Sequence, residues 1–354
     1  MFDGVLARGR VAPAVADEAW LRAMLDAEAA LAWARGLPDE VVDAIAAARV
    51  DARELGERAA ASGNPVVPLV DALREQVGPE VHRGATSQDI LDTAAMLVVR
   101  DALVPLREDL AAAADAAARL AAEHRATPMI GRTLLQQAVP TTFGLKAAGW
   151  MSGLDAAGRR LAAFRPAAQL GGPAGTLDGL GPEVLARFAT SLGLDEPALP
   201  WHTERTRIAE LAGALGTAAG AIAKPAGDIV LLAQTEVGEV REAAPGGSSS
   251  MPHKRNPVAA ISARACARQA PGLVSTLLAA MEHEHERAAG AWHAEWAPLR
   301  ALLVATGSAA AWLRTSLEGL QVDAERMRSN LGAHDEGAVA SAAALVDRAL
   351  AGRT

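Results

Sequence analysis

The sequence predicts an all-α protein built around a bundle of long helices. Ala and Leu, which are strong helix formers, dominate the chain, and aromatic residues make up only 3% of it. Runs of β-branched residues, which would favour a large sheet, are scarce. About half of the 354 residues are hydrophobic (51%), so the chain is long enough to bury a large core. We therefore expect an elongated bundle of long helices joined by short loops.

The expected helices follow the spacing of apolar residues and the positions of helix breakers. Apolar residues recur at helical spacing over 14–36, and Gly63-Asn64-Pro65 interrupts the chain. Thr86 or Ser87 is the expected N-cap of a helix over about 90–103, and Asp89 follows Thr86 as in a capping box. Further helices are expected at about 105–123, 140–164, 206–240, 257–286, 295–320 and 336–351. The first of these starts at a proline, and Pro225 is expected to kink the third.

These helices are expected to form three units along the chain. They are an N-terminal helical domain (1–103), a central long-helix bundle (104–330) and a remnant of a C-terminal domain (331–354). No internal repeat of solenoid-like period is present in the sequence.

Charge and composition argue against several classes of partner. The net charge is −8 and no basic stretch is clustered, which argues against nucleic acid. The most apolar long stretch, 208–223, carries Glu210, so we interpret it as a buried core helix and not as a membrane span. Cys266 is the single cysteine, and the N-terminus lacks the basic and apolar regions of a signal peptide, so we expect a cytoplasmic protein.

Residues 246–257 form the most specific motif of the chain. They read Gly-Gly-Ser-Ser-Ser-Met-Pro-His-Lys-Arg-Asn-Pro. A Gly/Ser run alone is typical of a flexible linker. A linker, however, has no reason to carry Met-Pro, Asn-Pro and one of the few lysines of this chain. The string is similar, at every fixed position, to the signature loop Gly-Ser-Ser-x-Met-Pro-x-Lys-x-Asn-Pro of the fumarase/aspartase superfamily.

The resemblance implies roles for the residues of this loop. In the superfamily the first Ser of the motif is the catalytic base, which corresponds to Ser248, and Ser249 beside it is expected to contact substrate. The Lys and Asn bind a substrate carboxylate and correspond to Lys254 and Asn256. A serine is a poor base unless cations and backbone N–H groups stabilise its alkoxide. A Gly-rich loop can close over substrate and expel water, which strengthens such interactions.

A second segment, residues 82–93, combines a helix start with a candidate anion site. Hydroxyls and free N–H groups at a helix N-terminus bind carboxylates, although an ordinary helix start would look similar. The superfamily has Thr-Ser-x-Asp here, so the resemblance implies that Thr86, Ser87 and the preceding His82 bind substrate. The Ala-Thr-Ser-Gln-Asp form resembles the cycloisomerase branch of the superfamily, in which Trp usually follows the His; Arg83 stands there in this chain.

The third segment, residues 131–138, departs from the lyases of the superfamily. Those lyases carry Thr-His-Leu-Gln, whose His belongs to the general-acid apparatus. Here Leu134 takes the place of the His, and Gln136 is the expected substrate contact. A second His, which adenylosuccinate lyases place upstream, aligns by local pattern with Asn64.

The absence of these two histidines indicates which kind of leaving group the enzyme can expel. Water is a weaker acid than a carboxylic acid by about 12 pKa units. An enzyme that expels hydroxide or an amine therefore needs a general acid, whereas one whose leaving group is an intramolecular carboxylate does not. The departures thus favour a cycloisomerase, with an inactive enzyme as the alternative.

Two further strings resemble the cycloisomerase branch. They are Pro-Trp-His-Thr at 200–203 and Glu-His-Glu-Arg followed by Trp-His-Ala-Glu-Trp within 284–296. The resemblance implies that His202, Arg205, His285 and Arg287 bind substrate carboxylates, whereas a solvated helix face is the alternative. The histidines of 283–293 lack a helical metal spacing such as His-x-x-x-His, so we expect no metal.

The resemblance extends over nearly the whole chain from about residue 10. It implies a cofactor-free homotetramer whose active sites are shared between subunits, with a small tricarboxylate as substrate. The implied reaction is the lactonisation of 3-carboxy-cis,cis-muconate in protocatechuate catabolism. The alternatives are an adenylosuccinate- or argininosuccinate-type lyase, a non-catalytic protein on this fold, and an enzyme for a related tricarboxylate or lactone. Family members usually continue into a small C-terminal helical domain, most of which is expected to be missing after Thr354.

Overall fold

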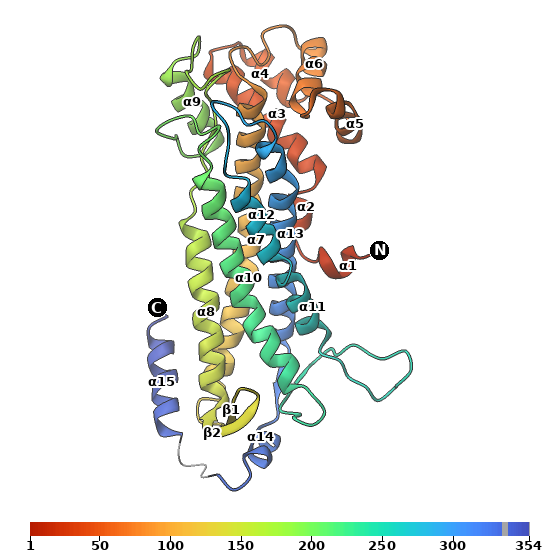
Figure 1. The fold of residues 1–354 in the computed structure, drawn as a ribbon, viewed down its shortest axis with the longest axis vertical. Coiled ribbons are helices and arrows are strands. Elements are labelled where there is room, and N and C mark those ends of the chain that lie inside the picture. The colour runs from red at the N-terminus through yellow and green to blue at the C-terminus, as the bar shows by residue number, and fades with distance from the viewer. Residues whose placement is uncertain (335–338, 354) are drawn as a thin grey trace.

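The computed structural model describes residues 1–334 and 339–353, and its centre is a bundle of long helices (Figure 1). The bundle consists of α7 (Ser87–Glu123), α8 (Phe143–Ala163), α10 (Thr206–Leu232), α11 (Val258–Ala267), α12 (Ala270–Ala279) and α13 (Ala291–Glu318). Buried Ala and Leu side chains fill the space between these helices, among them Leu106, Leu154, Leu215 and Leu313. The predicted all-α class is confirmed.

Shorter helices cover the upper end of the bundle as Figure 1 shows it. They are α3 (Asp17–Ala34), α4 (Asp39–Ala46), α5 (Ala52–Ser62), α6 (Val66–Gln76) and α9 (Pro182–Leu192), preceded by α1 (Asp3–Leu6) and α2 (Val11–Ala14). Gly63, with a φ of 73°, ends α5 in the left-handed conformation, as the predicted breaker requires. Helix α3 packs against both α7 and α9, and it thereby joins the cap to the bundle.

Two small antiparallel sheets lie at the lower end of the bundle (Figure 1). One is the hairpin of β1 (Pro128–Thr133) and β2 (Gln136–Thr142), with a bulge between Ile130 and Arg132. The other pairs β3 (Val240–Glu242) with β4 (Leu320–Val322). Helix α14 (Ala324–Leu331) packs against β1, and α15 (Ala340–Ala351) packs against α8.

Several predicted boundaries are wrong. No break separates 90–103 from 105–123, because α7 continues through Pro105. The division between the first two predicted units therefore falls inside a helix. The predicted helix over 257–286 is two helices, with Pro271 in the first turn of the second. The predicted start of the last helix near 336 lies outside the described residues.

The long helices separate the two ends of the molecule by a large distance. Helix α7 has 37 residues and α10 has 27. At a rise of about 1.5 Å per residue they are about 55 Å and 40 Å long. Residues at the upper end are therefore out of reach of residues at the lower end.

Candidate active site

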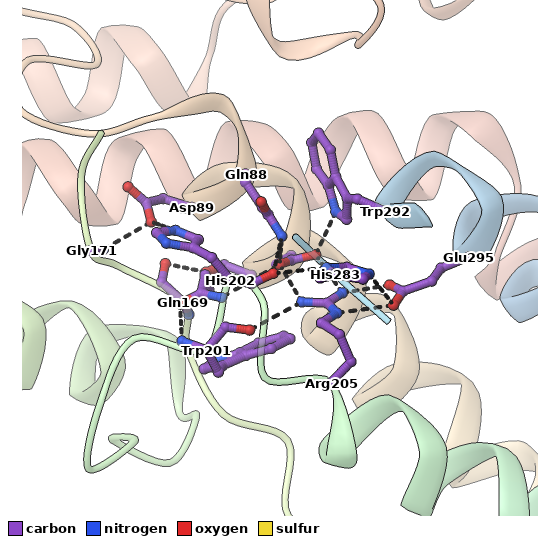
Figure 2. A network of polar contacts seen from close by, with 12 residues as sticks. Gln88, Asp89, Gln169, Gly171, Trp201, His202, Arg205, His283, Trp292 and Glu295 are labelled. Carbon is purple, nitrogen blue, oxygen red and sulfur yellow. Dashed lines mark hydrogen bonds and ion pairs between the residues drawn. The ribbon is translucent and has the colours of Figure 1, made fainter. Parts of the chain in front are cut away.

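A buried network of charged and polar side chains lies near the N-terminal ends of α7, α10 and α13 (Figure 2). Arg205, only 2% exposed, is at its centre. Its guanidinium donates to both carboxylate oxygens of Asp92, at 2.8 and 3.1 Å, and to both of Glu295, at 2.5 and 3.0 Å. His283 Nε2 lies 3.3 Å from Glu295 Oε1, and the Trp292 indole donates to Asp92 at 3.0 Å. These contacts fix the three helix ends relative to one another.

The charges of this network stabilise each other inside the protein. Burial alone would raise the pKa of Asp92, but the charge and hydrogen bonds of Arg205, with those of Trp292 and Gln88, hold it below its ordinary value. Burial alone would lower the pKa of Arg205. The charges and hydrogen bonds of Asp92 and Glu295 outweigh burial and raise this pKa above its ordinary value. Asp92 and Arg205 are therefore both ionised at neutral pH.

Asp89 joins three segments of the chain through one buried carboxylate. It accepts hydrogen bonds from the backbone of Thr86 at 2.9 Å, Gly171 at 2.8 Å and Gly172 at 3.0 Å, and from His202 Nε2 at 2.7 Å. The Thr86 contact belongs to the predicted capping box of α7, which the structure contains. Asp89 thus places the α7 N-terminus against the glycine-rich turn at 171–175.

The burial of His202 and Arg205 changes how their roles are understood. Both were predicted to bind substrate carboxylates, yet both are buried and already bonded to carboxylates of this chain. A guanidinium that faces two carboxylates has no net charge to offer a third. Their contacts favour a role in positioning the segments around them, and their binding of substrate carboxylates stays a prediction.

Arg287 and His285 lie on the segment that precedes α13. Arg287 donates to Gln88 Oε1 at 2.9 Å and to the backbone carbonyls of Pro173 at 2.7 Å and Gly172 at 3.3 Å. His285 is exposed. Arg287 therefore holds the glycine-rich turn, while His285 stays accessible to a ligand.

Backbone strain occurs in three of the segments that the sequence singled out, 82–93, 131–138 and 284–296. Among the described residues, five that are not glycine have φ in the left-handed region: His82, Leu134, Leu135, Leu177 and His285. Such conformations carry a cost and persist where the surrounding structure enforces them, often at functional sites.

The loop of residues 246–257 lies at the lower end of the bundle, between β3 and α11 (Figure 1). Reciprocal backbone hydrogen bonds of 2.9 Å between Gly246 and Asn256 close its base. Within it, Ser248 Oγ accepts the backbone N–H groups of Met251 at 3.1 Å and Ser250 at 3.4 Å. Lys254 and Ser249 are exposed, and the Asn256 amide donates to the Gly247 carbonyl at 3.1 Å. Ser248 Oγ thus lies within hydrogen-bond distance of two backbone N–H groups.

The tip of the β1–β2 hairpin carries the third predicted segment. Leu134 is 96% exposed and Leu135 is 74% exposed, and Gln136 beside them is exposed as well. Arg132 in the same hairpin forms a bidentate pair with the buried Glu239, at 2.7 and 3.0 Å. Because Glu239 directly precedes β3, this pair ties the hairpin to the base of the 246–257 loop.

A single chain does not bring these segments together. Arg205 stands at the start of α10, and Glu239 is hydrogen-bonded to Leu232 at its end, so the network and the loop base are about 40 Å apart. Each arm of the loop has about five residues and spans at most about 18 Å. Thr86, Ser87 and His82 therefore lie at one end of the chain, and Ser248, Lys254, Asn256 and Gln136 lie at the other.

A cavity of about 640 Å³ lies beside the upper network. Apolar side chains dominate its lining, including Trp20, Leu91 and Trp296, and Arg300 pairs with Asp17 at 2.6 Å nearby. None of the predicted site residues lines it.

The sequence interpretation missed several members of the network. Gln169, His283 and Glu295 were not assigned a role, nor was Glu28, which contacts His82 at 2.6 Å. A detectable signal existed for Glu28, since it is the only charged residue between Ala27 and Ala34. No local sequence signal indicates that Glu295 pairs with Arg205, because 90 residues separate them.

Comparisons with known proteins agree on one family. A family model described as "Lyase" matches residues 11–272. A nitrosuccinate lyase from Streptomyces davaonensis is 47% identical over 94% of this chain and 76% of that protein. A 3-carboxy-cis,cis-muconate cycloisomerase from Bradyrhizobium diazoefficiens is 48% identical over 90% of this chain and 76% of that protein. The crystal structure of 3-carboxy-cis,cis-muconate lactonizing enzyme from Pseudomonas putida superposes with a TM-score of 0.89 at 42% identity, covering 94% of this chain and 79% of that one.

Proposed function

We infer the function of this chain from the family to which it belongs, the lyase family whose model matches residues 11–272. We propose that it is an enzyme that interconverts 3-carboxy-cis,cis-muconate and a carboxymuconolactone. The observation that carries this proposal is the 246–257 loop, where the family signature is complete and Ser248 Oγ faces two backbone N–H donors. Relatives named for this reaction match nearly the whole chain.

The proposed reaction balances without any external reactant. One substrate carboxylate oxygen forms a C–O bond to the diene, and a proton is added to the carbon next to another carboxylate. Negative charge builds on that carboxylate as an aci-carboxylate before the proton arrives. In the reverse direction the proton leaves and the C–O bond breaks, with the ring carboxylate as leaving group.

Ser248 is the proposed proton donor in lactonisation and the base in the reverse reaction. The amides of Ser250 and Met251 stabilise its alkoxide, and Lys254 on the same loop adds a positive charge. Such positioned proton transfer contributes about 10²–10⁴-fold to rate.

The remaining predicted residues are proposed to bind the carboxylates. Thr86 and Ser87 offer hydroxyls at the N-terminus of α7, and Lys254 and Asn256 offer a cation and an amide on the loop. His82, Gln136, Ser249 and His285 are proposed as further contacts. Arg287 would contribute through the glycine-rich turn that it holds.

Leu134 supports a reaction with a weakly basic leaving group. A leucine cannot protonate hydroxide or an amine as it departs, and a carboxylate needs no such help. This favours the cycloisomerase over adenylosuccinate- and argininosuccinate-type lyases, which expel amines.

We propose that the active sites are shared between copies of the chain in a homotetramer. The separation of about 40 Å between the two groups of site residues supports this, because one small substrate cannot reach both in one chain. One face of helix α10 is also exposed and consists mostly of small residues. Its exposed residues recur every three, four or seven positions, as in a coiled coil: Gly213, Thr217, Gly220, Lys224 and Leu231. Small residues allow helices of other copies to approach closely. The near-complete exposure of Leu134 and Leu135 is a further reason to expect a covering partner.

Elimination from nitrosuccinate is the second candidate function. The relative from Streptomyces davaonensis is named for this activity. Expulsion of nitrite, a weakly basic anion, would also proceed without the acid that Leu134 replaces. Leu134 therefore fits both candidates, and the substrates must be compared directly.

The test is to add purified protein to 3-carboxy-cis,cis-muconate and follow the ultraviolet absorbance of the diene, which lactonisation destroys. We expect rapid loss of absorbance, a decrease in rate of about 10²–10⁴-fold in Ser248→Ala, and little change in Ser250→Ala. Ser250 is a matched control, since only its backbone contacts Ser248. A folded protein that leaves the diene intact but releases nitrite from nitrosuccinate would replace the first candidate with the second.

A further inference from the structure

A buried carboxylate holds the imidazole ring of His82. Glu28, in the middle of α3, is 1% exposed, and its Oε1 accepts a hydrogen bond from His82 Nδ1 at 2.6 Å. His82 lies in the turn that leads into Thr86 and the start of α7. The pair therefore connects the cap of the molecule to the proposed carboxylate-binding end of α7.

The contact fixes which ring nitrogen is free. A carboxylate only accepts hydrogen bonds, so the proton of the pair is on Nδ1. Nε2, on the opposite side of the ring, faces away from α3. It has no hydrogen-bond partner among the described residues and is not a buried atom. The His82 side chain keeps 12% of its surface exposed, so Nε2 is accessible to a ligand.

The second oxygen of Glu28 shows that this carboxylate is costly to bury. Glu28 Oε2 is buried and has no hydrogen-bond partner among the described residues. An uncompensated buried carboxylate is strongly unfavourable, whereas an imidazole ring with protons on both nitrogens would compensate its charge. In that form of the ring Nε2 carries an N–H group, which is a donor for an anion.

The backbone of His82 is also held in place. Its φ of 63° is unusual for a residue with a side chain. Arg35, the C-cap residue of α3, anchors the same turn by donating to the Glu80 carbonyl at 2.7 Å. Glu28 in α3 and Arg35 at its C-cap thus both hold the turn, but of these two only Glu28 contacts the imidazole ring.

We propose that Glu28 is a positioning residue that orients His82 so that Nε2 binds a carboxylate of the substrate next to the N-terminus of α7. This rests on the proposed function, since it assumes a substrate with several carboxylates. Glu28 itself does not touch the substrate.

The test compares Glu28→Gln, His82→Gln and the double variant with the unmodified protein. Glutamine keeps the size of Glu28 but removes its charge. We expect each single variant to raise KM about tenfold with kcat changed much less, because a charge-assisted hydrogen bond to bound substrate is lost. The double variant should be no worse than His82→Gln, since Glu28 acts through His82.

Glu80→Gln is the matched control. It weakens the anchoring of the same turn through Arg35 and Arg83 without touching the imidazole ring, and its KM should stay within about twofold of the unmodified protein. An unchanged KM in Glu28→Gln would overturn the proposal. So would a Glu28→Gln substitution that raises KM as much in the His82→Gln protein as in the unmodified protein. The double variant leaves no unpaired charge, so it should fold even if one of the single variants does not. Its KM can then be compared with that of the single variant that remains folded.

Failure of the proposed function gives a different result. In that case the unmodified protein turns over neither the carboxymuconate nor nitrosuccinate. The affinity of the same proteins for tricarballylate, measured by calorimetry, then tests the role of Glu28 without turnover. Weaker binding in Glu28→Gln supports the positioning role, and equal binding contradicts it.

Discussion

At the scale of single residues, the upper network shows charges used to organise the fold. Asp89 holds Thr86, two glycine amides and His202, and Arg205 holds Asp92 and Glu295. Asp89, His202, Arg205, Asp92 and Glu295 are all buried, and each is bonded to a distant part of the same chain. Lys254, which is proposed to bind a carboxylate, is by contrast exposed and lies outside this network.

Asp92→Asn should destabilise the protein most at neutral pH. Breaking a buried ion pair costs about 3–5 kcal/mol, because the remaining partner loses its compensation. Since Arg205 lowers the pKa of Asp92 below 3.8, the stability that this carboxylate contributes is present above pH 3.8 and is lost as the pH falls through its folded value.

Urea unfolding from pH 7 to below pH 3.8 measures this effect. The gap between Asp92→Asn and the unmodified protein should shrink towards acid pH. Asp347→Asn, which removes an exposed partner of Arg125, should change the midpoint little at any pH. A gap that stays constant with pH would mean that the lost charge is not the cause.

At the scale of elements, Glu242 secures the loop that carries Ser248. This buried residue of β3 accepts the backbone N–H groups of Ala259 at 3.1 Å and Ala260 at 2.8 Å, and the Ser316 hydroxyl at 2.6 Å. A carboxylate at the N-terminus of α11 is also favoured by the helix dipole. The loop is thus fixed where it enters α11, and its middle is exposed.

Glu242→Gln should loosen the base of this loop. The neutral amide loses the charge-assisted bonds and turns an NH2 group towards N–H donors, so the anchor weakens by about 1.5–3 kcal/mol. We expect a clear loss of turnover and faster tryptic cleavage after Lys254 and Arg255. Glu318→Gln, at an exposed pair with Arg314, is the control. Cleavage and turnover like those of the control would show that Glu242 does not hold the loop.

The elements also show where sequence reasoning succeeds and fails. The capping box of Thr86 and Asp89 is local chemistry, so the sequence predicts it. Pro105 looked like a helix start because its local preference is strong, but buried Leu103 and Leu106 on either side hold α7 together through tertiary packing. The β1–β2 hairpin was missed because it contains Gly131, two prolines at 128 and 140, and no strict apolar alternation.

At the scale of the whole molecule, the long helices determine how a site can be built. The sequence predicted the residues of the loop and of the α7 start from local motifs. It could not predict that Arg205 and His202 are buried, because their partners Glu295 and Asp89 are about 90 and 110 residues away in the chain. The separation of about 40 Å between the two groups follows from helix length, which the sequence predicted only approximately.

Mixing two inactive variants should restore activity if sites are shared. Ser248→Ala damages the loop end and Ser87→Ala, with Thr86→Ala, damages the other end. In hybrids formed by co-expression, about a quarter of the sites would combine an intact loop from one copy with an intact α7 start from another. Turnover of hybrids is compared with that of each variant alone, and hybrids as inactive as the parents would argue for sites within one chain.

The preference for arginine in these ion pairs has a consequence at high pH. Lysine side chains lose their charge near pH 10, whereas a guanidinium stays charged beyond that range. Arg205 and Arg132, which each bind a buried carboxylate through two hydrogen bonds, therefore keep their contacts in alkaline solution. The framework of buried ion pairs should thus keep the helical bundle folded in solutions alkaline enough to discharge lysines, which unfolding measured by circular dichroism against pH would show.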